Sequence, residues 1–375
     1  MKVKFGDVVK DVKENVDRAN NPYEFYVAGD HMDSEDFRIH RRGRFETDDV
    51  GPAFVRIFRP GQVLYGSRRT YLKKVCVADF EGVCANTTFV LETKDEGVLL
   101  QKLLPFLMLS EGFTDWSVKH SKGSTNPYVL FSDLADYEFD LPSIDRQREL
   151  AELLWAANDL KEKYKKLITA SDEMLKAKFR EIFGNDLSID DNASVKLEDL
   201  GKWESGGTPS RRHPEYFEGE INWYSAGELN SLYLPPSVEK ISQKAVENSA
   251  AKVWPAGSML VGMYDSAALK MGILTEDSAS NQACACIQPD SGRVDLIWLR
   301  YALEMQKEDI LKTVRKGTKQ KNLSLGIIKS LRVPNAPLDL QRQFVEIAAQ
   351  EEKVKANLKK SIADVDNIIK GLING

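Results

Sequence analysis

The chain has 375 residues, of which 42% are hydrophobic and 29% are charged, and its formal net charge is −5. This length suits two globular domains that each bury a core, and the composition is typical of a folded protein in water. The negative net charge excludes a uniformly basic surface for nucleic acid, so any such surface must be local. Because the sequence has no apolar run of membrane length and no signal-peptide core, we expect a cytoplasmic protein.

The first globular half combines short β-rich runs with one predicted helix. Gly, Pro and Asn residues separate the apolar runs, which is typical of short strands joined by turns. We expect strands at 54–58, 63–65, 75–77 and 88–91, and a helix over 97–110. The pattern predicts an α+β domain with an irregular sheet and long loops.

Basic residues cluster locally in this half, although the chain as a whole is acidic. One run extends from Arg38 to Arg44, and a second contains Arg68, Arg69, Lys73 and Lys74. A charge run is by default a solvated face, so neither run by itself indicates a ligand.

A long amphipathic helix is predicted to follow. In LPSIDRQRELAELLWAANDL (Leu141 to Leu160), either Ser143 or Asp145 can cap the helix, and apolar residues then alternate spacings of three and four. The helix can run to about Phe183 before a Gly-Asn pair stops it, which gives a length of roughly 55 to 60 Å. This spacing is typical of a coiled-coil seam.

The second half repeats this plan at a shift of 192 to 196 residues. The stretch APLDLQRQFVEIAAQEEKV (Ala336 to Val354) places Gln341 on Gln147, and its apolar positions keep the same register. Four other segments match in the same order: Val3 to Val8 with Val195 to Leu200, Arg59 to Gly66 with Trp254 to Gly262, Ala85 to Thr87 with Ser280 to Gln282, and His120 to Pro127 with Arg315 to Asn322. A period this long indicates duplicated domains rather than a solenoid.

Four features of the second half follow in chain order. They are a turn-rich loop (Ser205 to Arg212), a helix over 295–312, a basic run from Lys312 to Lys321, and a second long helix from near Asp339 to near Leu372. The last would span roughly 50 Å. The basic run occupies the place that a shorter Lys119 and Lys122 cluster holds in the first repeat, which raises its interest as a binding surface.

These elements predict an α+β chain of two globular domains and two long helices. If the helices pair antiparallel as a coiled coil, each buries its seam and an approximate two-fold axis relates the two domains. The expected bounds are 1–142 and 186–337 for the globular domains, and 143–185 and 338–375 for the helices. The expected seam residues are Leu150, Leu153, Leu160, Tyr164, Leu167, Phe344, Ile347, Val354, Leu358, Val365 and Ile368.

No catalytic or metal-binding pattern accompanies this layout. The cysteines, at 76, 84, 284 and 286, make no disulfide framework, and Cys284 and Cys286 are expected as small buried strand residues. Two Asn-Pro-Tyr turns lack the second proline of the tetrad that amino-methyltransferases use, and no Gly-rich turn follows to seat a methyl donor. P-loop, HExxH and nucleophile-elbow patterns are absent too. We therefore expect a non-catalytic binding protein without cofactor or metal.

The whole chain resembles the specificity subunits of type I restriction-modification systems. LPSIDRQREL and APLDLQRQF are similar to the start of that family's two spacer helices, and SGGTPSR with PEYFEGEINWYSAGEL (Pro214 to Leu229) is similar to the start of a target-recognition domain. In the first half, GSRRTYLKKVCVADFEGVCANTTFV (Gly66 to Val90) and KGSTNPYVLFSDLADYEFDLP resemble another recognition-domain class.

This resemblance implies that each globular domain reads one half of a bipartite target in double-stranded DNA. The helices would fix the gap between the half-sites and dock two methyltransferase subunits, which supply the methyl-donor site and the adenine chemistry. Two motor-nuclease subunits can join such a complex to cut unmodified DNA. The two domains differ strongly outside the shared segments, so their half-sites should differ.

Candidate DNA contacts follow from the basic loops and the resemblance. Lysine and arginine contacts to phosphate supply affinity, whereas contacts to base edges supply specificity. In the first domain we select Arg68, Arg69, Lys73, Lys122, Ser124 and Asn126. In the second we select Arg211, Arg212, Tyr264, Lys316, Lys319 and Lys321, with a core aromatic as the alternative for Tyr264 and a simple turn for the glycine-rich loop.

A second hypothesis from a different class is a scaffold whose two domains bind protein partners only. It explains the duplication and the acidic charge equally well. It does not explain basic loops at matched places in the two repeats.

Overall fold

The computed structural model describes residues 1–184, 193–317 and 322–374, apart from the side chains of Asp265 and of residues 313–317. The chain divides into two compact units. The first contains Met1–Lys166 and Leu358–Gly375, and the second contains Leu167–Asn357. Within the described residues, no helix is both long enough and apolar enough to cross a membrane.

The first unit contains three small sheets. Two have four strands, in the orders β2-β9-β6-β7 and β4-β3-β8-β5, and the third pairs β1 with β10. Every pairing is antiparallel except that of β3 with β8. The strands are β1 Lys2–Lys4, β2 Val9–Asp11, β3 Phe25–Val27, β4 Gly43–Arg44, β5 Phe54–Phe58, β6 Val63–Gly66, β7 Val75–Val77, β8 Gly82–Ala85, β9 Thr88–Thr93 and β10 Glu138–Asp140. The helices that accompany them are α1 Phe5–Val8, α2 Leu104–Leu107, α3 Glu111–Lys119 and α4 Phe131–Ala135.

The second unit repeats this topology strand for strand. Its sheets have the orders β12-β19-β16-β17 and β14-β13-β18-β15, with β11 paired to β20 and with β13 and β18 again the parallel pair. The strands are β11 Ser194–Lys196, β12 Gly201–Ser205, β13 Ile221–Tyr224, β14 Glu239–Ile241, β15 Val253–Trp254, β16 Met259–Gly262, β17 Met271–Ile273, β18 Ser278–Ser280, β19 Cys284–Pro289 and β20 Arg332–Pro334. The helices are α6 Gln243–Glu247, α7 Leu296–Gly317 and α8 Leu325–Ser330.

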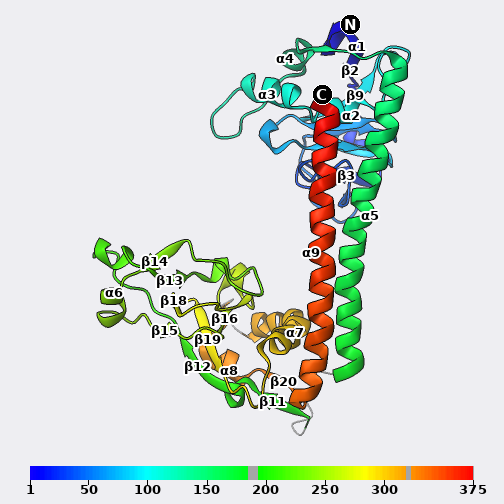
Figure 1. Cartoon of the computed structure of the whole chain (residues 1–375). Coiled ribbons are helices and arrows are strands. Elements are labelled where there is room, and N and C mark those ends of the chain that lie inside the picture. The colour runs from blue at the N-terminus through cyan, green and yellow to red at the C-terminus, as the bar shows by residue number, and fades with distance from the viewer. Residues whose placement is uncertain (185–192, 318–321, 375) are drawn as a thin grey trace. The chain divides into compact units, whose positions relative to one another are not determined.

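Two long helices contribute to both units: α5 (Ile144–Phe183) and α9 (Leu338–Asn374). The Ser143 hydroxyl accepts from the Arg146 N–H at 3.4 Å at the start of α5, and Gly184, with φ +95°, ends the helix as expected. The first part of α5 lies beside the last part of α9 in the first unit, and the remaining parts lie together in the second (Figure 1). The helices therefore run antiparallel, and the predicted fold class is confirmed.

The duplication extends to the ion pairs between the helices. In the first unit the Lys161 ammonium lies 2.6 Å from the Asp366 carboxylate. In the second unit Lys355, the counterpart of Lys161, lies 2.8 Å from Asp172, the counterpart of Asp366. Each lysine is mostly buried, so these pairs favour one register of the two helices.

The buried stripe of each helix differs from the predicted seam. Phe344 and Val365 are buried, and Leu150, Tyr164, Ile347 and Leu358 are half-buried. Five other seam residues are between 40% and 55% exposed: Leu153, Leu160, Leu167, Val354 and Ile368. The reason is that each helix packs against a globular core as well as against its neighbour, so Ala151, Leu154, Ala348 and Ile369 are buried instead.

The predicted helix over 97–110 is wrong for most of its length, because only Leu104–Leu107 is helical. The carbonyl of Val98 and the N–H of Leu100 hydrogen-bond to the side chain of Gln147 on α5. They do not form the backbone hydrogen bonds of a helix. The strands expected at 54–58 and 75–77 are confirmed at their bounds, and the second expected helix corresponds to α7.

Candidate nucleic-acid interface

Three segments of the first unit meet where β6 ends. Ser67 donates its N–H to the carbonyl of Thr87 at 3.2 Å, and its own carbonyl accepts from the N–H of Val129 at 3.0 Å. The Arg69 N–H donates to the carbonyl of Pro127 at 2.6 Å, and the hydroxyls of Thr70 and Ser121 lie 3.1 Å apart. The loop after β6 and the segment after α3 thus form one surface, which we call the first loop junction (residues 67–74, 87 and 120–129).

The backbone of this junction is strained at two residues. Arg69 has φ +50° and Lys73 has φ +49°, and both are residue types that rarely adopt the left-handed region. Between them, Leu72 donates to the carbonyl of Arg69 at 2.8 Å and Lys73 to that of Thr70 at 2.9 Å. Strain of this kind costs about 1 to 3 kcal/mol per residue and concentrates at functional sites.

Arg68 and Arg69 carry the unneutralised charge of the first junction. Both are exposed, and neither guanidinium forms a hydrogen bond or an ion pair with any residue that the structure describes. The aromatic side chains of Tyr71 and Tyr128 are exposed beside the two arginines and were not among the expected DNA contacts. Their places in the sequence could have indicated them, because Tyr71 lies inside the basic run and Tyr128 follows the Asn-Pro turn.

The other four candidates of the first unit also lie at the junction, in different electrostatic settings. The Lys73 ammonium is 3.0 Å from the Glu35 carboxylate, and that of Lys122 is 2.9 Å from Asp133. The hydrogen bond from Lys122 is the main reason that the pKa of Asp133 is lowered. Ser124 and Asn126 are exposed after Gly123, where φ is +90°.

The second unit has the same junction in its backbone. Met263 takes the place of Ser67: its N–H donates to Ala283 at 2.9 Å, and its carbonyl accepts from Leu323 at 2.8 Å. Leu269 takes the place of Lys73 and has φ +56°. These residues, with Tyr264, define the second loop junction (residues 263–270, 283 and 322–323).

At the second junction, Tyr264 and Leu269 stand at the positions that the basic residues Arg68 and Lys73 hold in the first. Tyr264 stands where the first junction has Arg68, and it is half-buried against the core of its unit, the alternative considered for it. The side chain of Lys316 lies outside the described residues, as do Lys319 and Lys321 altogether. Their contacts with DNA stay a prediction.

The glycine-rich loop after β12 approaches other backbone segments closely. A Cβ atom on Gly206 would lie 2.3 Å from the carbonyl oxygen of Asn281, and one on Gly207 would lie 2.1 Å from that of Ala250. Only glycine fits at these two positions, so here the glycines are explained by packing.

The two arginines that follow this loop differ in their contacts. Arg211 binds both carboxylate oxygens of Glu239, at 2.5 and 2.7 Å, and its guanidinium lies over the ring of Phe217 at 4.3 Å. This contact lowers the pKa of Glu239. Arg212 is exposed, and its guanidinium has no partner among the described residues. Arg212 is therefore the better placed of the two for an external anion.

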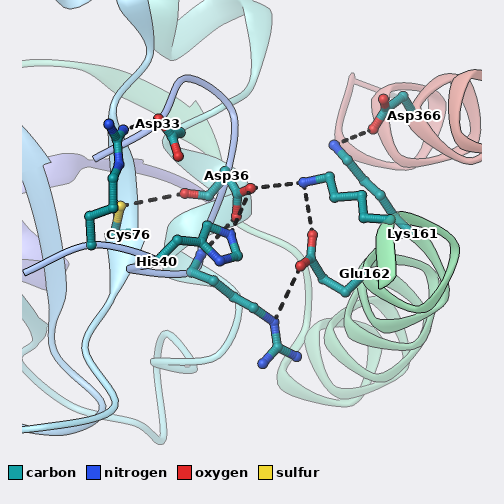
Figure 2. Close-up of polar contacts among 10 residues, drawn as sticks. Asp33, Asp36, His40, Cys76, Lys161, Glu162 and Asp366 are labelled. Carbon is teal, nitrogen blue, oxygen red and sulfur yellow. Dashed lines mark hydrogen bonds and ion pairs between the residues drawn. The ribbon is translucent and has the colours of Figure 1, made fainter. Parts of the chain in front are cut away.

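The basic run from Arg38 to Arg44 is occupied by intramolecular contacts. Figure 2 shows the centre of this network, in which Asp36 connects the segment between β3 and β4 to helix α5. The Lys165 ammonium lies 2.8 Å from both Asp36 and Glu162, and Arg38 lies 3.1 Å from Asp159. The remaining arginines of the run pair with Asp33 and Glu24 or lie over the ring of Phe25. The run therefore anchors the segment to the helix.

Two protonation equilibria are coupled to this anchor. Burial alone would raise the pKa of Asp36, but hydrogen bonds from Lys165 and from the Arg38 N–H outweigh it, so the pKa is lowered. Burial alone would lower the pKa of Lys165, but the bonds to Asp36 and Glu162 raise it. Both groups are thus held in their charged forms.

The cysteines are buried strand residues, as expected for Cys284 and Cys286. Cys284 and Cys286 lie in the same hydrophobic cluster, and burial raises the pKa of Cys76, Cys84 and Cys284 to about 12. In residues 1–184, 193–317 and 322–374, no group of three His, Cys, Asp or Glu side chains is placed to hold a metal ion.

The fold and the two loop junctions define a duplicated protein: two α+β units of one topology, each with a three-segment loop surface and each built on the same two helices. Comparison with known proteins agrees. Residues 189–365 match the family of the type I restriction modification DNA specificity domain. These residues carry the likeness to the DNA specificity domain of type I restriction-modification systems.

Curated relatives resemble part of the chain. The specificity subunit of the EcoR124I/EcoR124II enzyme of Escherichia coli is 26% identical over 40% of this chain and 38% of its own length. The MjaIX specificity subunit of Methanocaldococcus jannaschii is 24% identical over 44% of this chain and 39% of its own. The matches thus span about two fifths of the relatives' length.

Solved structures resemble the whole chain in fold. A chain from a structure on complex assembly and conformational transition of the type I R-M system has a TM-score of 0.61 at 18% identity, covering 100% of this chain and 96% of that one. The S subunit from M. genitalium has a TM-score of 0.55 at 14% identity, with coverage of 100% and 94%. At such identities the likeness concerns the fold alone.

Proposed function

We propose that this chain is the non-catalytic DNA-recognition subunit of a type I restriction-modification complex. Residues 1–142 and 186–337 each read one half of a bipartite target in double-stranded DNA. The helices, residues 143–185 and 338–375, set the gap between the half-sites and dock two methyltransferase subunits. Two motor-nuclease subunits complete the restriction form of the complex. As a partner of DNA, the protein would work in the cytoplasm.

The observation that carries the proposal is the pair of exposed arginines at the first loop junction. A guanidinium without an intramolecular partner keeps five donors for a phosphate or for the O6 and N7 atoms of guanine. The strained backbone at Arg69 and Lys73 is held by hydrogen bonds from three segments, so the arginines are presented on a fixed surface. Exposed Tyr71 and Tyr128 add planar groups for contact with sugar or base.

The matched junction in the second unit supports a two-part target. The two backbone hydrogen bonds of Met263 match those of Ser67, but Tyr264 and Leu269 replace Arg68 and Lys73, so the chemistry of the second junction differs. Unlike side chains on one backbone frame favour two unlike half-sites.

The exposed leucines of α5 support docking of a protein partner on the helices. Leu153 and Leu160 are seven residues apart, which places them on one face, and they are 51% and 40% exposed. A partner subunit that covers them buries apolar surface that the chain itself leaves in water.

The test is a methylation map of cells with and without this gene. We expect one bipartite adenine-methylation motif to disappear when the gene is deleted and to return when it is restored. An unchanged map, in cells shown to express the chain and its methyltransferase partner, would refute DNA recognition and favour the protein scaffold.

A further inference from the structure

Each long helix carries one buried glutamine near its start that hydrogen-bonds to the globular unit beside it. Gln147, in the first turns of α5, is fully buried. Its side-chain oxygen accepts from the Leu100 N–H at 3.0 Å. Its amide nitrogen donates to the carbonyls of Val98, at 2.8 Å, and Pro142, at 3.0 Å.

Gln341 makes the same three contacts in the second unit. It is 2% exposed, and its side-chain oxygen accepts from the Asp295 N–H at 2.8 Å. Its amide nitrogen donates to the carbonyls of Arg293, at 3.0 Å, and Ala336, at 2.8 Å. The partners correspond to Leu100, Val98 and Pro142 at a shift of 194 or 195 residues, so the whole arrangement is duplicated.

The chemistry of these contacts explains why a glutamine is needed. Its amide offers two donors and an acceptor on one planar group, and here both donors and the oxygen are used. All six partners of the two glutamines are backbone groups in turns or near the start of a helix. The glutamine side chains supply hydrogen bonds that regular secondary structure does not supply there. Removing the amide would leave a buried N–H and two carbonyls without partners, which is unfavourable because buried polar groups need hydrogen bonds.

Among the described residues, the polar contact of Trp155 with the globular part is not duplicated. Trp155 donates its indole N–H to the carbonyl of Lys102 at 2.8 Å, but Ala349 stands at the corresponding position of α9. The glutamine contact is therefore the polar attachment that both units share at the start of their helix.

We propose that Gln147 and Gln341 are positioning residues that fix the direction in which each helix leaves its domain, and thereby the gap between the half-sites. This inference rests on the proposed function. Over a helix of about 60 Å, a tilt on the order of 3° moves the far end by about one base-pair step of about 3.4 Å. A loosened attachment should therefore widen the range of gap lengths that the complex accepts, while each domain still reads its own bases.

The experiment uses the full chain with its partner subunits in cells that carry a plasmid library. Each plasmid holds the two half-sites of the native motif at a gap that is up to two base pairs shorter or longer. The variants are Gln147→Met and Gln341→Met, which keep the length of the side chain and remove its hydrogen bonds. Gln343→Met, two residues along α9 and exposed, is the matched control.

We expect each glutamine variant to raise methylation at gaps one base pair from native, relative to the native gap, by about tenfold. The bases of both half-sites should stay as in the wild type, and Gln343→Met should keep the wild-type gap profile. If a Met variant abolishes methylation, the gap profile is measured on Gln147→Glu instead, because its carboxylate still accepts from the Leu100 N–H.

Two outcomes separate this inference from the proposed function. Variants that methylate the native half-sites with a wild-type gap profile would overturn the positioning role, even if their melting temperature falls. Absence of any bipartite methylation by the wild-type complex would instead overturn the proposed function.

Discussion

Arg68 and Arg69 differ from the arginines at 38, 41 and 44 in what neutralises their charge. The latter pair with carboxylates of their own unit, whereas the two junction arginines have no such partner among the described residues. A sequence cannot reveal this difference, because both sets look alike as basic runs. Only the fold brings Asp33, Glu24 and the acids of α5 to the first set.

Replacement of Arg68 or Arg69 by Ala should weaken DNA recognition without unfolding the domain. If the arginine contacts a guanine edge, one base position of one half-site should relax by about 1 to 3 kcal/mol, whereas a phosphate contact should weaken all sequences alike. Binding of the assembled complex to a panel of single-base target variants measures this. Arg59→Ala is the control, because Arg59 is bound at 2.6 and 2.7 Å by Glu14. Equal losses in all three variants would count against the junction as the interface.

Asp36→Asn should destabilise the first unit in a pH-dependent way. The pKa of Asp36 is lowered in the folded state, so its contribution is present above its ordinary value of about 3.9 and is lost as the pH falls through the folded pKa. We expect the variant to lose about 1 to 3 kcal/mol of unfolding free energy at pH 7, and the difference to shrink below about pH 4.

Urea unfolding at pH 7 and pH 3, followed by circular dichroism, measures both quantities. Asp33→Asn is the control, since Asp33 pairs with Arg41 at an exposed site and should contribute at most about 1 kcal/mol. An Asp36→Asn difference that stays constant between the two pH values would contradict the ion-pair anchor.

At the scale of elements, the helices and several strands could be predicted because their signals are local. Gly184 ends α5 where the sequence suggested, and β5 and β7 have the expected bounds. The helix over 97–110 failed because its backbone groups are bound by Gln147, which is distant in sequence. The seam at Leu153 and Leu160 differed because periodicity does not say which of two neighbours a helix face contacts.

The site was predictable to a similar extent. Proximity of the loop after β6 to the segment after α3 follows from the tertiary hydrogen bonds of Ser67 and Arg69, which no spacing indicates. Arg211 was selected as a basic loop residue, but its bidentate contact with Glu239 depends on β14. The sequence duplication was a better guide to the site than the basic runs, because it places Tyr264 at the position of Arg68.

The stability lost by reversing one charge of the Lys161–Asp366 pair should be recovered by reversing the other charge. Lys161→Asp places two carboxylates together and should lower the unfolding free energy by about 1.5 to 3 kcal/mol, because a charged hydrogen bond is lost where Lys161 is mostly buried. Adding Asp366→Lys should recover most of the loss. Thermal unfolding of the two single variants and the double variant gives the coupling. Lys163→Asp, exposed on the same helix, should change stability little.

For the whole molecule, a net charge of −5 implies that the proposed DNA affinity comes from local basic loops rather than from a uniformly basic surface. Affinity of the assembled complex should fall steeply between low and high salt, because lysine and arginine contacts release counterions from the phosphates. Removing one phosphate-contacting charge should reduce the slope of log affinity against log salt by about 1. Filter binding measures the slope, and a flat response would favour a protein scaffold.

The loop junctions share the backbone hydrogen bonds of Ser67 and Met263 although their side chains have diverged. Three matched positions hold different residues in the two junctions: Ser67 and Met263, Arg68 and Tyr264, and Lys73 and Leu269. The last two share a positive φ. Side-chain identity at these positions is thus uncoupled from the stability of the frame that holds them. Under the proposed function, point mutations there would change the preferred bases without refolding the domain.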